Sequence, residues 1–151
     1  MEPFLISESY LTLFGLSFLA ATIFPLGSEW LLAAMIISGS SIPISIAVAS
    51  SGNYLGAVTT YLIGLYGGVF LIRRVLGISE EKEARARISY EKYGIWTLLL
   101  SWLPIVGDPI CLVGGLMKTG FIRFSILVFT GKLARYTFVA WIVKEGTVLI
   151  K

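Results

Sequence analysis

Histidine does not occur in the 151-residue sequence, and cysteine occurs only once, at Cys111. Without histidine the chain lacks the imidazole base of Ser-His-Asp and Cys-His catalytic systems, and it lacks a common metal ligand. A single cysteine allows neither a disulfide framework nor a thiolate metal cluster within one chain. We therefore expect a protein that is not an enzyme and that holds no metal and no cofactor.

Charged residues are also scarce. They make up 14% of the chain, against roughly 25% in typical soluble domains, while 56% of residues are hydrophobic and the mean hydropathy is +0.86. No Asp, Glu, Lys or Arg occurs from Ser9 to Ser28 or from Trp30 to Ile72. The second run far exceeds the about 20 residues that a membrane-spanning helix needs. The composition predicts an all-α integral membrane protein forming one membrane domain over residues 1–151.

The net charge of +3 comes largely from basic residues between Arg73 and Arg123. These residues flank apolar segments, so they indicate a membrane surface and not a nucleic-acid partner. By the positive-inside rule the basic loop 73–92 should be cytoplasmic, and the chain should be a multi-pass protein of the inner or plasma membrane. The loop is either a simple solvated face or a surface that attracts anionic lipids.

Two short segments share a pattern in which a proline precedes a carboxylate by four residues. Pro25 precedes Glu29 and Pro104 precedes Asp108, so the two segments are 104 − 25 = 79 residues apart. The same shift places Gly52 on Gly131 and Gly67 on Gly146. This register predicts an internal repeat whose helices break at five positions: Pro25, Gly27, Pro104, Gly107 and Pro109.

The repeat predicts two halves, one at about 9–76 and one at about 94–149, joined by an amphipathic cytoplasmic linker over 77–93. Arms of about ten residues reach about 15 Å, half of the roughly 30 Å hydrocarbon core. Each half should therefore be a re-entrant helical hairpin followed by a long transmembrane helix. Because each half crosses once, the repeat should be inverted. The first arm, Ser9–Ile23, could nearly cross, so the hairpin of repeat 1 is either re-entrant or fully spanning.

Small residues form a stripe along the long helix expected over Ile42–Leu76. The glycines involved include Gly52 and Gly56, which form a GxxxG pattern that lets a second backbone approach closely. We expect this stripe to serve packing within the chain, with a homo-oligomer as the alternative.

Glu29 and Asp108 lie in apolar surroundings just after the predicted breaks. An ionised carboxylate at membrane depth is costly, so it should pair with a cation, bind a proton or line water. We predict a proton-coupling role for both acids. The alternative is that each acid caps the half-helix that follows it.

Lys132 and Arg135 lie three residues apart near the middle of the last predicted helix, and so on one face. They should bind a phosphate or carboxylate group, or else form ion pairs with Glu29 and Asp108. Asn53, the repeat counterpart of Lys132, should add a polar contact or an interhelical hydrogen bond. Ser28 should line the same substrate-binding site.

Four segments together resemble the DedA family of membrane proteins, also called the VTT or SNARE-associated domain, and most closely its small YqaA-like branch. In chain order they are Phe24–Glu29, Gly52–Gly56, Leu103–Pro109 and Gly131–Tyr136. The likeness covers nearly the whole chain and depends on the order and spacing of the segments. Larger members carry arginines flanking the second break, where this sequence has Ser101 and Gly107. This difference shifts phosphate recognition to Lys132 and Arg135.

The resemblance implies two inverted re-entrant hairpins and a role in moving lipids or lipid-linked phosphates across a membrane. We therefore expect a lipid transporter or flippase acting on phospholipid or polyprenyl-phosphate, in which proton coupling would involve Glu29 and Asp108. One alternative is an uncoupled lipid scramblase. Another is a membrane scaffold that transports nothing and binds other proteins through its glycine stripes.

Overall fold

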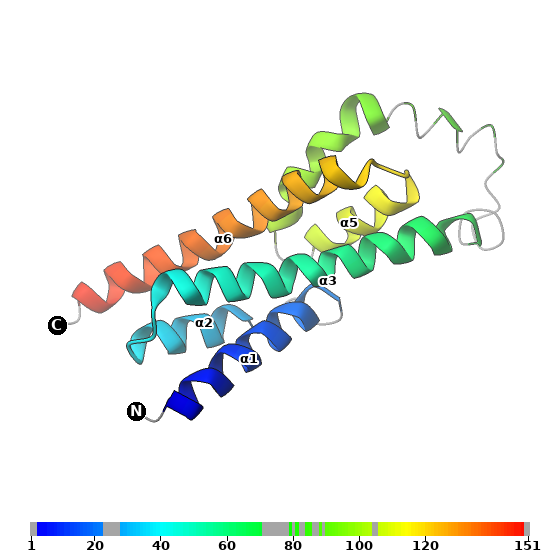
Figure 1. The fold of residues 1–151 in the computed structure, drawn as a ribbon. Helices are drawn as coiled ribbons and strands as arrows, with labels where there is room; N and C mark the ends of the chain where they lie inside the picture. The colour runs from blue at the N-terminus through cyan, green and yellow to red at the C-terminus, as the bar shows by residue number, and fades with distance from the viewer. Residues whose placement is uncertain are drawn as a thin grey trace. The chain divides into compact units, whose positions relative to one another are not determined.

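The computed structural model describes residues 3–22, 28–70, 79, 81, 84–85, 88, 90–103 and 106–149, and every regular element in these ranges is helical (Figure 1). The predicted all-α class is thus confirmed for the described residues. Three of the predicted breaks, Pro25, Gly27 and Pro104, lie outside these ranges, as does much of the linker predicted over 77–93. The described residues form two compact units, and each is described by itself.

Unit 1 comprises residues 1–56 and 132–151. It contains α1 (Pro3–Ala20), α2 (Ser28–Ile37), the first part of α3 (Ile42–Phe70) and the last part of α6 (Phe121–Leu149). Helices α1 and α2 pack against each other as a hairpin. The core of this unit is apolar and draws on all four helices, with these buried residues: Leu13, Leu32, Met35, Ile36, Ala49, Tyr136 and Ala140.

Unit 2 comprises residues 57–131. Its helical hairpin consists of η3 (Ile95–Trp102), a 3₁₀-helix, and α5 (Gly107–Leu116), which pack against each other. A single π-helical turn, η2 (Tyr90–Gly94), precedes η3. The sequence predicted an apolar arm here but not its 3₁₀ geometry. Tyr61 of α3 packs on Phe124 of α6 with ring centroids 4.3 Å apart, and its hydroxyl donates to the carbonyl of Thr119.

The 79-residue repeat recurs in the helix bounds. Helix α5 begins 107 − 28 = 79 residues after α2 and has the same ten-residue length, and α6 begins 121 − 42 = 79 residues after α3 and has the same 29 residues. Buried positions recur as well, since Leu32 and Cys111 are both fully buried, as are Ala49 and Val128. The short and the long helix of each half therefore have the same bounds in the repeat, whereas the arms that precede them differ, α1 being an α-helix and η3 a 3₁₀-helix.

The turn that follows each short helix has the same hydrogen bonds. After α2, Ser40 donates to the carbonyl of Met35 and Gly39 donates to that of Ile36, which is the Schellman pattern. After α5, Thr119 and Lys118 make the corresponding bonds to Gly114 and Gly115. The residue with positive φ is Gly39 (89°) in the first turn and Lys118 (53°) in the second. Lysine in this left-handed conformation costs roughly 1–2 kcal/mol, which the rest of the turn must offset.

Glycines allow α3 to approach its neighbours closely. In unit 1 a Cβ on Gly52 would meet the carbonyl oxygen of Phe14, and one on Gly56 would meet that of Phe18, both in α1. In unit 2 a Cβ on Gly64 would meet the carbonyl oxygen of Leu112 in α5. The GxxxG pair is therefore used for packing within the chain, which was the preferred interpretation of the stripe.

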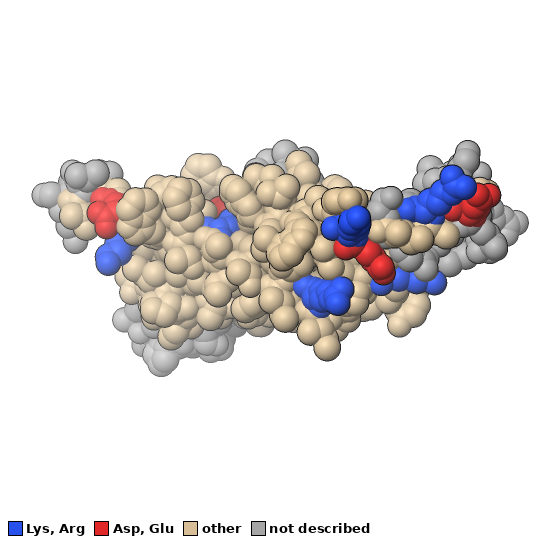
Figure 2. Space-filling view, turned by 90° about the horizontal axis from the view of Figure 1, so that it is seen from above, with Lys and Arg blue, Asp and Glu red and all other residues tan. Residues whose placement is uncertain are grey.

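Uncharged residues cover most of the face shown in Figure 2. In the described part of the chain, one helix is long and apolar enough by length and composition to cross a membrane, Phe121–Val148 within α6. Helix α3, predicted as the other crossing, does not meet the same measure, because serines, glycines and Asn53 occupy its middle.

We predict that Gly56→Ala lowers the free energy of unfolding by about 2–3 kcal/mol, because the added methyl group would overlap Phe18 of α1 and Ala21, which directly follows α1. The matched control in the same helix is Gly67→Ala, since a methyl group on Gly67 would meet no atom of the described residues within 4 Å. The control should leave stability unchanged or raise it by up to about 1 kcal/mol. Unfolding in mixed detergent micelles, followed by circular dichroism, measures both. Equal effects of the two substitutions would contradict the close approach.

Candidate functional site

Unit 1 contains a group of polar side chains in and beside its apolar core, which we call the polar cluster. It links all four helices of the unit through hydrogen bonds and one ion pair. Three members come from one face of α6 within about one turn, and the others come from α2 and α3. The members are Ser28, Glu29, Asn53, Lys132, Arg135 and Tyr136.

Glu29 and Arg135 form the ion pair of the cluster, between Arg135 Nη2 and Glu29 Oε1. Their side chains are only 22% and 14% exposed, so the pair is partly removed from solvent. Glu29 lies in the first turn of α2, where the positive end of the helix dipole also favours a carboxylate. Removing either partner would leave a partly buried charge without its counter-ion, which is strongly unfavourable.

Lys132 is 2% exposed, and its ammonium group donates a hydrogen bond to Oδ1 of Asn53. The Nδ2 group of Asn53 in turn donates to the main-chain carbonyl of Ser17, at 3.1 Å. Asn53 therefore connects α6 to α1 through one side chain. Its amide oxygen accepts a hydrogen bond from the ammonium group of Lys132 but carries no formal charge.

Ser28 and Tyr136 share a buried hydrogen bond, with their hydroxyl oxygens 2.8 Å apart. Tyr136 was not among the site residues predicted from the sequence. Its spacing was the available signal, because Tyr136 follows Lys132 by four residues and so shares its face of α6. The bond places two hydroxyl groups next to the Glu29–Arg135 pair along both helices.

Two further hydroxyl groups, those of Ser17 and Ser50, are buried in unit 1 and make no hydrogen bond within the described structure. Ser50 precedes Asn53 by three residues on α3, and it too was not predicted from the sequence. Buried polar groups are almost always satisfied, by protein or by ordered water. These two hydroxyls therefore give the region of the polar cluster additional capacity for a water molecule or a polar ligand group.

The predicted residues of the second break lie in unit 2. Helix α5 begins at Gly107, and Asp108 and Pro109 are in its first turn. Asp108 is half-buried, and the N-cap residue of α5 is Val106, whose side chain makes no capping hydrogen bond. A Cβ on Gly107 would meet the carbonyl oxygen of Ser101, so a larger side chain would not fit there in this conformation.

The polar cluster is not repeated in unit 2. The residues 79 positions from Ser28 and Tyr136 are Gly107 and Ala57, whose side chains cannot form hydrogen bonds. The polar cluster therefore draws on both halves of the repeat but lies in unit 1 alone.

The cluster combines two cations, one carboxylate and several hydroxyl and amide groups in a largely buried setting. In the residues that the structure describes, no three His, Cys, Asp or Glu side chains are grouped so that they could hold a metal ion. An arrangement with two cations suits the binding of an anion, for which the carboxylate of Glu29 would be the resident competitor.

Comparisons with known proteins give a consistent result. The VTT domain family model matches residues 9–145. The inner membrane protein YqaA of Escherichia coli (strain K12) is 37% identical over 139 residues, which cover 91% of this chain and 93% of that protein. An uncharacterized protein of Haemophilus influenzae is 33% identical over 138 residues, covering 86% of this chain and 84% of the relative. No solved structure matches the chain.

The Ser28–Tyr136 bond leads to a prediction for stability. Tyr136→Phe should lower the free energy of unfolding by about 1–2 kcal/mol, because the buried hydroxyl of Ser28 loses its partner. Adding Ser28→Ala should cost less than the sum of the two single changes, with a coupling of about 1 kcal/mol. Unfolding of the four proteins of this double-mutant cycle in detergent measures the coupling. Additive effects would show that the bond contributes nothing.

Proposed function

This chain belongs to the VTT-domain family, also called the DedA family, and from that premise we propose that it moves phosphate-bearing lipids across a membrane. The observation that carries the proposal is the polar cluster, which contains the buried Lys132 and the ion pair of the partly buried Arg135 with Glu29. Charged groups buried in a membrane protein usually mark a pathway for ions or polar substrates.

The proposed arrangement in the membrane is an inverted repeat in which each half is a re-entrant hairpin followed by a long helix. It is supported by the short helices α2 and α5, which at ten residues each reach about 15 Å, or half of the hydrocarbon core. Helix α6 would be the crossing of the second half. We further propose a multi-pass topology with the basic loop 73–92 on the cytoplasmic side, as in the inner membrane of the relative from E. coli.

The proposed mechanism is an exchange of partners at Arg135. In the resting state its guanidinium group binds the carboxylate of Glu29. The oxygens of a phosphate also accept charge-assisted hydrogen bonds from a guanidinium group, so an incoming headgroup would compete with Glu29 for Arg135. The ammonium group of Lys132 would add a second positive charge. The hydroxyl of Ser28 and the amide of Asn53 would complete the binding of the headgroup.

Proton coupling is proposed to act through Glu29. Protonation removes the negative charge of its carboxylate, so Arg135 becomes available to the phosphate, and loss of the proton restores the ion pair. Asp108 of α5 is proposed as the second proton-coupling acid, because it occupies the corresponding position in the second half of the repeat.

Transport measurements in proteoliposomes test the proposal. The purified protein is reconstituted with fluorescent phospholipid or labelled polyprenyl-phosphate, and movement between leaflets is followed with and without a proton gradient. Movement that depends on the gradient and loses this dependence in Glu29→Gln supports the coupled carrier. Movement unaffected by either condition would indicate the uncoupled scramblase. Failure to move any lipid would favour the scaffold.

We predict that Arg135→Lys lowers the transport rate by about tenfold or more, because lysine keeps the charge but cannot make the two parallel hydrogen bonds of arginine. The matched control is Lys144→Gln, which removes an exposed cation from the same helix and should leave the rate unchanged. The double variant Glu29→Gln, Arg135→Gln removes both charges of the pair and should fold but transport poorly. Full transport by this double variant would rule out a role for the ion pair.

A further inference from the structure

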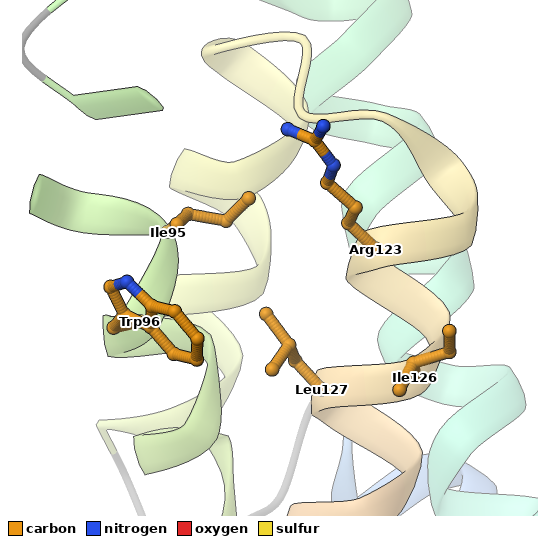
Figure 3. A pocket seen from close by; sticks show the side chains of 5 residues that line it. All are labelled: Ile95, Trp96, Arg123, Ile126 and Leu127. Atoms are coloured by element: carbon orange, nitrogen blue, oxygen red, sulfur yellow. The ribbon is translucent and has the colours of Figure 1, made fainter. Parts of the chain in front are cut away.

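A pocket of about 300 Å³ lies in unit 2, and none of its lining residues belongs to the polar cluster (Figure 3). Ile95 and Trp96 of η3 form one side, and residues of the first two turns of α6 form the other. In Figure 3 the side chains of Trp96 and Leu127 face each other across the pocket. The remaining lining residues are Arg123 and Ile126.

The lining is apolar except at one end. Figure 3 shows the guanidinium group of Arg123 at this end, beyond the side chain of Ile95. The lining residues include no acid, and no carboxylate in the described part of the chain forms an ion pair with Arg123. The first turn of α6 also has no acidic residue to offset the positive end of the helix dipole. One end of an otherwise apolar pocket is therefore positively charged.

The pocket is open, and its apolar side chains are accessible from outside. Trp96 is 65% exposed and Ile126 is 62% exposed. In a membrane protein such side chains meet the acyl chains of lipids, and tryptophan is enriched at the level of the lipid headgroups. The pocket lining combines an aromatic side chain, a basic side chain and aliphatic side chains. This combination matches the chemistry of an amphiphile with a negatively charged headgroup.

We propose that this pocket binds one anionic membrane lipid, with an acyl chain between Trp96 and Leu127 and the headgroup phosphate on the guanidinium group of Arg123. The lipid is a resident ligand of unit 2 and not the transported substrate. The inference therefore does not require the polar cluster to transport anything, and the two can fail separately. Charge complementarity at Arg123 selects anionic lipids over zwitterionic ones.

Tryptophan fluorescence tests the proposal directly. A variant in which Trp30, Trp102 and Trp141 are replaced by phenylalanine keeps Trp96 as the single fluorophore. It is reconstituted in bilayers containing increasing fractions of brominated phosphatidylglycerol or brominated phosphatidylcholine, whose bromine atoms quench a nearby indole. We expect the variant to associate about fivefold more strongly with phosphatidylglycerol than with phosphatidylcholine. One basic side chain near an anionic headgroup gives a preference of about this size.

Two substitutions separate the charge from the pocket. Arg123→Gln should abolish the preference for phosphatidylglycerol, whereas Lys144→Gln, which removes an exposed cation outside the pocket, should preserve it. Leu127→Phe keeps every charge but narrows the pocket, and it should also reduce the preference. If Leu127→Phe leaves the preference for phosphatidylglycerol unchanged, the preference comes from general attraction of anionic lipids by the basic residues. This result would overturn the proposed pocket.

Two other outcomes would also overturn the proposal. Equal quenching by the two lipids in the starting variant would show that Arg123 selects no headgroup. Absence of quenching by either lipid would show that another part of a protein covers Trp96 in the membrane. As a check that does not depend on the tryptophan replacements, native mass spectrometry of the otherwise unaltered chain should show fewer bound phosphatidylglycerol molecules after Arg123→Gln.

Discussion

Close contact between helix backbones is the constraint on which unit 1 depends. Gly52 and Gly56 bring α3 against the main chain of α1. At this separation the short side chain of Asn53 donates to the carbonyl of Ser17 while its amide oxygen accepts from Lys132. Because Gly52 has no side chain, the neighbouring Asn53 lies close enough to α1 to bind its main chain. In an apolar environment this matters more than in water, because no solvent replaces a lost partner.

The polar cluster also shows how a repeated fold can contain a group of polar side chains that is not repeated. The short and long helices of the two halves have matching bounds, and the turns between them match, yet Ser28 and Tyr136 correspond to residues without polar side chains. The same helix packing recurs in both halves because many different small and apolar residues can provide it. An ion pair needs two specific side chains at one place, and the sequence supplies the Glu29–Arg135 pair in unit 1.

Much of this organisation could be predicted from the sequence. The recurrence of proline, glycine and acid at a fixed interval indicated the repeat, and long stretches without charge indicated the helices. Arg135 was a predicted partner of Glu29 because few cations occur in the apolar segments. The role of Tyr136 was not predictable in this way, since a tyrosine suits either a membrane surface or a buried hydrogen bond and only packing decides between them. The same holds for Lys118, because its left-handed conformation is imposed by the turn around it.

The geometry of η3 gives the second hairpin a different relation between length and reach. A 3₁₀-helix rises about 2.0 Å per residue, so the eight residues of η3 extend about 16 Å, whereas the same residues in an α-helix would extend about 12 Å. The first hairpin uses the 18 residues of α1 for its corresponding arm. The 3₁₀ geometry therefore makes η3 about 4 Å longer along the helix axis than an α-helix of the same residues would be. It offsets in this way a part of the difference in residue number between η3 and α1. The length of a helical arm is thus set by how tightly it is wound as well as by how many residues it contains.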